Sequence, residues 1–238
     1  MGDANFYWAD LHIHSALSPC ADNLMTPKAI VDQARREGLS IIALTDHNTV
    51  LNCPAILSYS SENLLIIPGM ELQTREEVHI LCLFEKLDDA LNWHHFIWNF
   101  TEQKPNQVGY FGSQLIFDSQ GGIVDEEPNL LLTSTNLRFE EIFREINNYH
   151  GIAIPAHIDR PSFSVLSNLG FLPLGLDIKT IEISAYDNEA DFREKYPEYR
   201  NNYIIQSSDA HRITEIGRGR TGFHLSKLCW SELKDLLK

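Results

Sequence analysis

The stretch Asp10-Leu11-His12-Ile13-His14 ends a short apolar run near the start of the chain, and it decides how the rest of the sequence is interpreted. In an extended strand, residues two apart point to the same face, so the two histidines would lie side by side. Such a pair can chelate a metal ion, but paired histidines on a strand can also be surface residues. The stretch therefore predicts a strand with candidate metal ligands at its end.

Four more strand-like runs end in residue types that bind metals. Leu39 to Thr45 leads into Asp46 and His47, Leu64 to Met70 into Glu71, Ile152 to Ala156 into His157, and Tyr203 to Ser208 into Asp209 and His211. Helical patterns separate several of these runs, which favours a parallel α/β sheet. Ligands at the carboxyl ends of many different strands fit a closed barrel better than an open sheet, because those ends converge in a barrel. We find no glycine-rich phosphate turn of the kind that an open doubly wound sheet usually has.

The segment from Thr101 to Leu132 differs from its surroundings. Glycines at 109, 112, 121 and 122 interrupt short apolar runs there. Helical periodicity returns from Leu137 to Tyr149 and precedes the strand-like run that ends at His157. We therefore expect an inserted hairpin and loop in this segment.

Composition limits the classes of protein that remain. The chain has 238 residues, a formal net charge of −14 and a pI near 5.0. This length suits one large domain, and the acidic balance disfavours electrostatic capture of nucleic acid. The four cysteines have no close-paired spacing, which is typical of reduced thiols. No signal peptide or membrane-spanning segment is apparent, so we expect a cytoplasmic protein.

Six short motifs, in this order along the chain, resemble those of the PHP (polymerase and histidinol phosphatase) superfamily. They are Asp10-Leu11-His12-Ile13-His14-Ser15, Thr45-Asp46-His47-Asn48, Pro68-Gly69-Met70-Glu71, Val78-His79, Pro155-Ala156-His157 and Ser208-Asp209-Ala210-His211. The resemblance implies a distorted (β/α)7 TIM-like barrel that holds two or three divalent metal ions, commonly manganese, iron or zinc. It also implies a single domain over residues 1–238, with the insertion at about 101–135.

The resemblance also implies a set of metal ligands. They are His12, His14, His47, Glu71, His79, His157, Asp209 and His211, with Glu71 in the place of a carboxylate that bridges two metals. A ninth ligand would come from the loop after the first pair. Spacing favours Cys20 and chemistry favours Asp22 almost equally. A thiolate there would favour zinc or iron over manganese.

This inventory suits a metal-dependent phosphoesterase, because phosphate-ester hydrolysis needs both hydroxide at neutral pH and neutralised phosphoryl charge. We expect hydrolysis through a metal-bridging hydroxide. Asp10 and Asp46, each near a ligand histidine, are candidates for orienting ligands or transferring protons. Arg160 and Arg212 are candidates for binding the substrate phosphate.

The expected substrate is a small-molecule phosphate ester, such as a nucleotide or sugar phosphate, and nucleic acid is not expected. Two alternatives stay open: a nuclease or editing-type domain that acts on nucleic acid, and a noncatalytic regulatory module that binds metal. The sequence does not indicate the oligomeric state.

Overall fold

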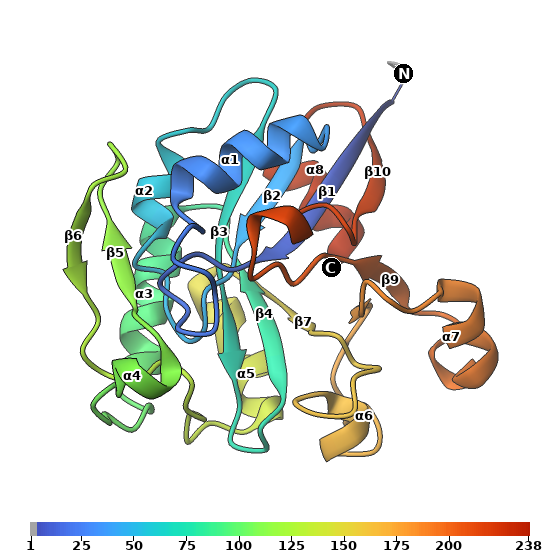
Figure 1. The fold of residues 1–238 in the computed structure, drawn as a ribbon. Coiled ribbons are helices and arrows are strands. Elements are labelled where there is room, and N and C mark those ends of the chain that lie inside the picture. The colour runs from blue at the N-terminus through green and yellow to red at the C-terminus, as the bar shows by residue number, and fades with distance from the viewer. Residues whose placement is uncertain (1–3) are drawn as a thin grey trace.

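The central feature of the computed structural model, which describes residues 4–238, is a curled six-stranded sheet in the order β10-β1-β2-β3-β4-β7 (Figure 1). Its strands are β1 (Asn5–Ile13), β2 (Ile41–Leu44), β3 (Leu65–Gln73), β4 (His79–Leu83), β7 (Ile152–Pro155) and β10 (Thr221–Leu225). A separate parallel pair consists of β8 (Thr180–Ile183) and β9 (Tyr203–Gln206). The mixed α/β architecture with a half-barrel sheet confirms the predicted fold class.

Helices connect and flank the strands, and α7 lies away from the six-stranded sheet (Figure 1). They are α1 (Pro27–Arg36), α2 (Cys53–Leu57), α3 (Leu87–Trp98), α4 (Val108–Phe111), α5 (Phe139–Glu145), α6 (Val165–Asn168), α7 (Glu189–Lys195) and α8 (Trp230–Leu237). Short 3-10 turns follow at Ile146–Tyr149, Pro197–Tyr199 and Ile213–Glu215. No helix within residues 4–238 combines the length and the apolar character that crossing a membrane requires.

Helix α1 forms where the sequence predicts it. The Thr26 hydroxyl accepts a hydrogen bond from the Ala29 backbone N–H at 3.2 Å, and Pro27 occupies the first turn. Gly38 follows the helix with a φ of +70°, a conformation that glycine adopts without strain. The helix buries Ile30 and Val31 against the sheet.

Both faces of β2 are buried, which explains its continuous apolar sequence. Ile42 and Leu44 belong to the apolar cluster that includes α1, whereas Ile41 and Ala43 belong to a second cluster. This second cluster lies on the opposite face and includes Leu233 of α8. The chain therefore has two apolar layers with the sheet between them.

Strand directions differ from the parallel arrangement that we expected. Strands β1, β2 and β3 are parallel, but β4 runs antiparallel to both β3 and β7, and β10 runs antiparallel to β1. Only a short turn joins β3 to β4, whereas a parallel crossover needs roughly a dozen residues or more. As a result β4 starts where β3 ends, and His79 pairs with Gln73 across the two strands.

The segment that we expected to be an insertion contains α4 and the antiparallel pair of β5 (Leu115–Phe117) and β6 (Ile123–Glu126). This pair lies apart from the six-stranded sheet (Figure 1). It contacts the loop after β1, because the Leu115 N–H donates to the Ala16 carbonyl at 2.9 Å. Asn52 also donates to the Leu115 carbonyl at 3.0 Å. The hairpin therefore supports the loop that follows the first two histidines.

Candidate metal centre

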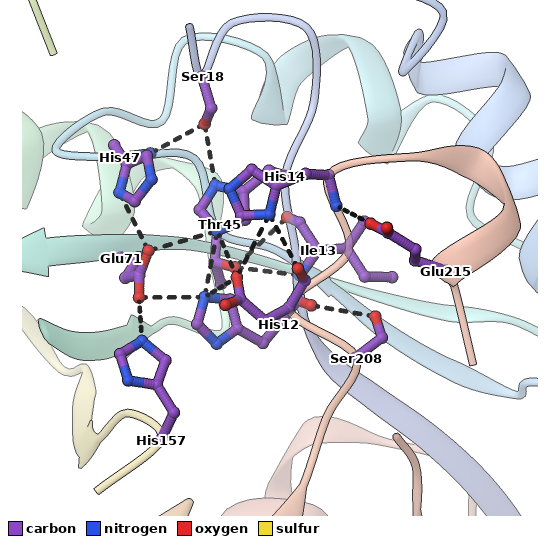
Figure 2. Close-up of polar contacts among 12 residues, drawn as sticks. His12, Ile13, His14, Ser18, Thr45, His47, Glu71, His157, Ser208 and Glu215 are labelled. Atoms are coloured by element: carbon purple, nitrogen blue, oxygen red, sulfur yellow. Dashed lines mark hydrogen bonds and ion pairs between the residues drawn. The ribbon is translucent and has the colours of Figure 1, made fainter. Parts of the chain in front are cut away.

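The carboxylate of Glu71, near the end of β3, is surrounded by imidazole rings (Figure 2). Its oxygens lie 2.7 Å from His79 Nδ1, 3.0 Å from His157 Nε2, 3.0 Å from His47 Nδ1, 3.3 Å from His12 Nε2 and 3.3 Å from His14 Nε2. Only 1% of the Glu71 surface is exposed. One buried carboxylate is therefore shared by five imidazoles from four different segments of the chain.

Backbone pairing places Glu71 beside His47. The two residues form a parallel bridge, and the Glu71 N–H donates a hydrogen bond to the Asp46 carbonyl at 3.1 Å. The Asn48 N–H donates in turn to the Glu71 carbonyl at 2.9 Å. Because β2 ends just before these residues, its loop turns across the end of β3 and places the His47 ring over Glu71.

Asp209, in the loop after β9, is the second shared carboxylate. Its Oδ1 lies 3.2 Å from the Nε2 atoms of both His12 and His14, and its Oδ2 lies 2.6 Å from the Arg160 guanidinium. The ring of His211 stacks on that of His14, with centroids 4.2 Å apart. Asp209 and His211 thus bring the loop after β9 against the first two histidines.

Within residues 4–238, donor atoms form three groups that could each hold a metal ion, and the predicted ligands His157 and Cys20 belong to none of these groups. The groups are His14, His47 and His211; His12, His14, Glu71 and Asp209; and His47, Glu71 and His79, with the donor atoms of each group within 4.8 Å of one another. Imidazole and carboxylate donors suit manganese, iron and zinc.

Buried polar atoms that make no hydrogen bond also indicate a metal site. Glu71 Oε2 and Asp209 Oδ1 lie near imidazole nitrogens, but none of these contacts has the geometry of a hydrogen bond, and such atoms are costly to bury. The Nε2 atoms of His12 and His14 lie 3.1 Å apart, a separation that two ligands of one ion can have. The residues present therefore fit a divalent metal group.

Contacts on the far side of the rings fix which nitrogen faces the centre. Ser18 Oγ donates to Asp46 Oδ1 at 2.7 Å, so it accepts the proton of His14 Nδ1, 2.9 Å away. His12 Nδ1 donates to Glu182 Oε2 at 3.0 Å. Both rings therefore turn Nε2 toward Glu71 and Asp209, which is the arrangement that metal-binding histidines use.

The electrostatics of the site separate two kinds of imidazole. Burial lowers the pKa of His79 and of His211 to about 4, so both rings are neutral near pH 7, the form that binds a metal. Burial also acts to lower the pKa of His14, but the neighbouring carboxylates of Asp209 and Glu71 outweigh it and raise that pKa to about 9. Burial opposes ionisation of Glu71, yet the surrounding imidazoles hold its pKa well below the usual range. In the absence of a cation, protonated imidazoles thus balance the negative charge of the buried carboxylates.

Asp46 and Asp10 are placed to orient their neighbours. Asp46 accepts hydrogen bonds from the Ser15 N–H and hydroxyl at 2.7 and 2.6 Å, in addition to the bond from Ser18. Asp10 accepts from the backbone N–H groups of Ser208 at 3.0 Å and Gly217 at 2.9 Å, and burial raises its pKa to about 6. Both carboxylates are buried and tie separate segments together.

Glu182 is a site residue that the sequence analysis missed. It lies on β8, is 2% exposed, and its Oε2 accepts from His12 Nδ1 and from the His157 backbone N–H, both at 3.0 Å. The available signal was a lone glutamate within the strand-like run Thr180 to Ser184. A buried acidic residue in a strand needs a partner, so such a position is a candidate for contact with a ligand histidine.

The remaining predicted residues lie on the rim. A cleft of about 300 Å³ beside the centre is lined by Cys20, Arg160, Tyr186, Ser208, Asp209, His211, Arg212 and Glu215. Cys20 is exposed and lies next to His47. Burial acts to lower the pKa of His47, but Cys20 and Glu71 outweigh it and raise that pKa to about 9. Asp22 instead accepts from the Leu24 N–H at 2.8 Å and closes a turn.

The arginines differ in their surroundings. Arg160 is 35% exposed and bonded to Asp209, whereas the side chain of Arg212 is 73% exposed. Arg220 lies over the Trp8 ring, 4.4 Å from its centroid, and donates to the Glu37 carbonyl. Arg160 and Arg212 therefore face the cleft, and Arg220 has a packing role.

Comparisons with known proteins identify relatives of this chain. The PHP domain family matches residues 10–161, which is more than half of the chain. The 5′-3′ exoribonuclease Rnm of Salmonella typhimurium is 38% identical over 80 residues, which are 31% of this chain and 26% of the relative. The chain therefore matches only about a quarter of that protein's length.

Two solved structures have a similar fold. The lesion-specific endonuclease PfuEndoQ of Pyrococcus furiosus has a TM-score of 0.76 at 20% identity, covering 98% of this chain and 56% of that one. A putative metal-dependent phosphoesterase of Bifidobacterium adolescentis has a TM-score of 0.60 at 16% identity, covering 96% and 95% of the two chains. Together the comparisons support a metal-dependent hydrolase, as the sequence predicts.

The expected substrate class was wrong. We expected a small-molecule phosphate ester and no nucleic acid, but two of the three proteins named above are an exoribonuclease and an endonuclease. The error has a physical reason, because the net charge of −14 averages over the whole surface. A substrate meets only the local field of the cleft, which side chains and bound cations determine.

Proposed function

Because the chain belongs to the PHP domain family, we propose that it is a metal-dependent nuclease that hydrolyses phosphodiester bonds of nucleic acid. The observation that supports this most strongly is the Glu71 carboxylate, shared by five imidazoles beside a cleft that Arg160 and Arg212 line. The relatives named as nucleases support the choice of substrate.

The proposed ligands are the eight residues of the buried centre, and Cys20 is proposed as the ninth. The eight are His12, His14, His47, Glu71, His79, His157, Asp209 and His211. We propose that they hold two or three divalent ions, chosen among manganese, iron and zinc. When bound, such ions lower the pKa of water and neutralise charge on phosphoryl oxygens.

The side chains around the centre have distinct roles in this proposal. Glu71 and Asp209 supply the negative charge that retains cations in a buried site. Asp46 and Glu182 orient His14 and His12 through the contacts described above. These contacts hold the ligand rings in place before substrate arrives.

Arginines supply the cationic groups that are not metals. One nitrogen of the Arg160 guanidinium bonds to Asp209. The remaining N–H groups can donate hydrogen bonds to a phosphate oxygen in the cleft. Arg212 lies farther out on the rim, and its exposed guanidinium can contact a neighbouring phosphate. Asp209 and Glu215 also line the cleft, at 2.6 Å from Arg160 and 3.9 Å from Arg212, so the arginines offer donors to a phosphate while bound cations would supply the net positive charge.

We also propose that residues 1–238 form a single domain with an insertion at about 101–135. The contacts of Leu115 with Ala16 and Asn52 support this, because they pack the insertion on the loop that leads away from the metal centre.

Cleavage of labelled oligonucleotides tests the proposed function. Full-length protein loaded with manganese, iron or zinc is incubated with single-stranded and duplex RNA and DNA, and the products are separated on denaturing gels. We expect shortened products that disappear when a chelator is added, and no products from Glu71→Gln. The proposal would be contradicted if the metal-loaded protein cleaved none of these polymers.

A further inference from the structure

One exposed aromatic side chain lies in the cleft beside the metal centre. Tyr186, in the loop after β8, is 79% exposed and lines the same cleft as the ligands Asp209 and His211 and the two rim arginines. We propose that Tyr186 is a stacking platform for an unpaired nucleobase of the substrate, next to the phosphate that is cleaved. This proposal deepens the nuclease function above and rests on it.

The Tyr186 ring is free to accept a base. Within residues 4–238 it stacks on no other aromatic ring. Phe163, the other aromatic near the centre, already stacks on His79 with centroids 5.0 Å apart. Tyr110, also exposed, packs on Phe111 at 4.7 Å. Tyr186 therefore differs from both in having an open aromatic face at the cleft.

The backbone on both sides of Tyr186 is anchored. The Ser184 N–H and hydroxyl donate to the Asp159 carboxylate at 2.8 and 2.6 Å. The Gln206 amide donates to the carbonyls of Ser184 at 3.0 Å and Asp187 at 2.9 Å. The loop is thus fixed immediately before and after an exposed ring, which reduces the entropy that binding would cost.

The chemistry of the cleft identifies the class of ligand. An aromatic face stacks on any base, and guanidinium groups bind phosphate oxygens. The volume of about 300 Å³ lies at the lower end of the range for ligand pockets, as expected for one nucleotide unit. A base can reach Tyr186 only when it is not stacked in a duplex. The arrangement therefore predicts a preference for single-stranded or locally unpaired nucleic acid.

Steady-state cleavage of a labelled single-stranded oligonucleotide tests the proposal. The metal-loaded wild type is compared with Tyr186→Ala, Tyr186→Phe and the control Tyr203→Ala, which removes a partly exposed tyrosine at the opposite end of the β8–β9 pair. Stacking is worth roughly 1–3 kcal/mol per base, so we expect Tyr186→Ala to raise KM about 5- to 140-fold. We expect unchanged metal content in every variant and near-normal KM in Tyr186→Phe and Tyr203→Ala.

An abasic substrate separates stacking from a structural role. In the wild type, removing the base beside the cleaved bond should raise KM about as much as Tyr186→Ala does, and the two changes together should not add. Equal KM values for Tyr186→Ala and the wild type on the intact oligonucleotide would overturn the stacking role and leave the nuclease function intact. A wild type that cleaves no oligonucleotide would overturn both, so the two failures are distinguishable.

Discussion

The buried centre around Glu71 and the exposed rim around Tyr186 lie side by side but are built differently. In the centre, some candidate ligands have a second contact that fixes their orientation, such as Glu182 on His12 and Ser18 on His14. On the rim, Tyr186 and the Arg212 side chain are 79% and 73% exposed and have few partners. The centre can hold ions in a fixed geometry, whereas the rim is open to a substrate.

This difference separates chemistry from selection of substrate. Substitutions in the centre should affect metal retention and therefore every reaction of the protein. Substitutions on the rim should change affinity for substrate while the metal content stays constant. The following variants test this separation, from the largest expected effect to the smallest.

Glu71→Gln should have the largest effect. The amide keeps the shape of the side chain but removes the charge that five imidazoles share, so metal should be lost. Metal catalysis supplies several kcal/mol, so activity should fall by about three orders of magnitude or more. Elemental mass spectrometry and oligonucleotide cleavage on the same sample measure both. Glu127→Gln, at a buried carboxylate outside the centre, is the matched control, and a Glu71→Gln protein with normal metal and activity would refute the assignment.

Glu182→Ala should weaken metal binding by about 10- to 100-fold, because it removes the acceptor that orients His12 and also bonds the His157 backbone. Glu182→Gln keeps one acceptor oxygen and should recover part of this affinity. Competition with a chromophoric chelator gives the affinities. Unchanged affinity in Glu182→Ala would show that the strand alone orients these ligands.

Arg160→Ala should lower kcat/KM by about 10- to 100-fold, since a hydrogen bond to a charged group contributes about 1.5–3 kcal/mol. Arg212→Ala should cost only a few-fold, because an exposed charge contributes about 0–1 kcal/mol. Cleavage rates at two salt concentrations and metal content are measured for both. Loss of metal from Arg160→Ala would place that residue in the centre rather than on the rim.

Substitution of Cys20 should have the smallest effect on turnover. This residue tests whether the set of metal ligands extends from the centre to the rim. Its exposed thiol should react with a thiol reagent in the metal-free protein and be protected when zinc is bound. Cys53 and Cys82 are buried, and burial raises the pKa of both thiols, so they should react only after unfolding. Equal labelling of Cys20 with and without zinc would remove it from the ligand set.

The sequence predicted the fold class and located the buried centre because ligand-type residues follow strand-like runs. His12 lies in β1, and His14, His47, His157 and Asp209 each follow a strand. These positions depend on local patterns of a few residues, which a single sequence contains. The antiparallel direction of β4 was not predicted, although the short turn before His79 excluded a parallel crossover.

Two other features depend on contacts that no local pattern contains. Glu182 acts on His12 across 170 positions of sequence, so only the folded chain shows its role. The substrate class was misjudged because net charge carries no information about the cleft, where Arg160 and Tyr186 are brought together from separate loops. Long-range placement, rather than residue type, limits the prediction in both cases.

Cleavage of a labelled single-stranded oligonucleotide, measured as metal is added back to chelator-treated protein, tests the central claim most directly. The account predicts no cleavage without metal and a rate that rises to a plateau at two or three equivalents of manganese, iron or zinc per chain. Cleavage that persists in the metal-free protein, or that never appears with any of these ions, would contradict it.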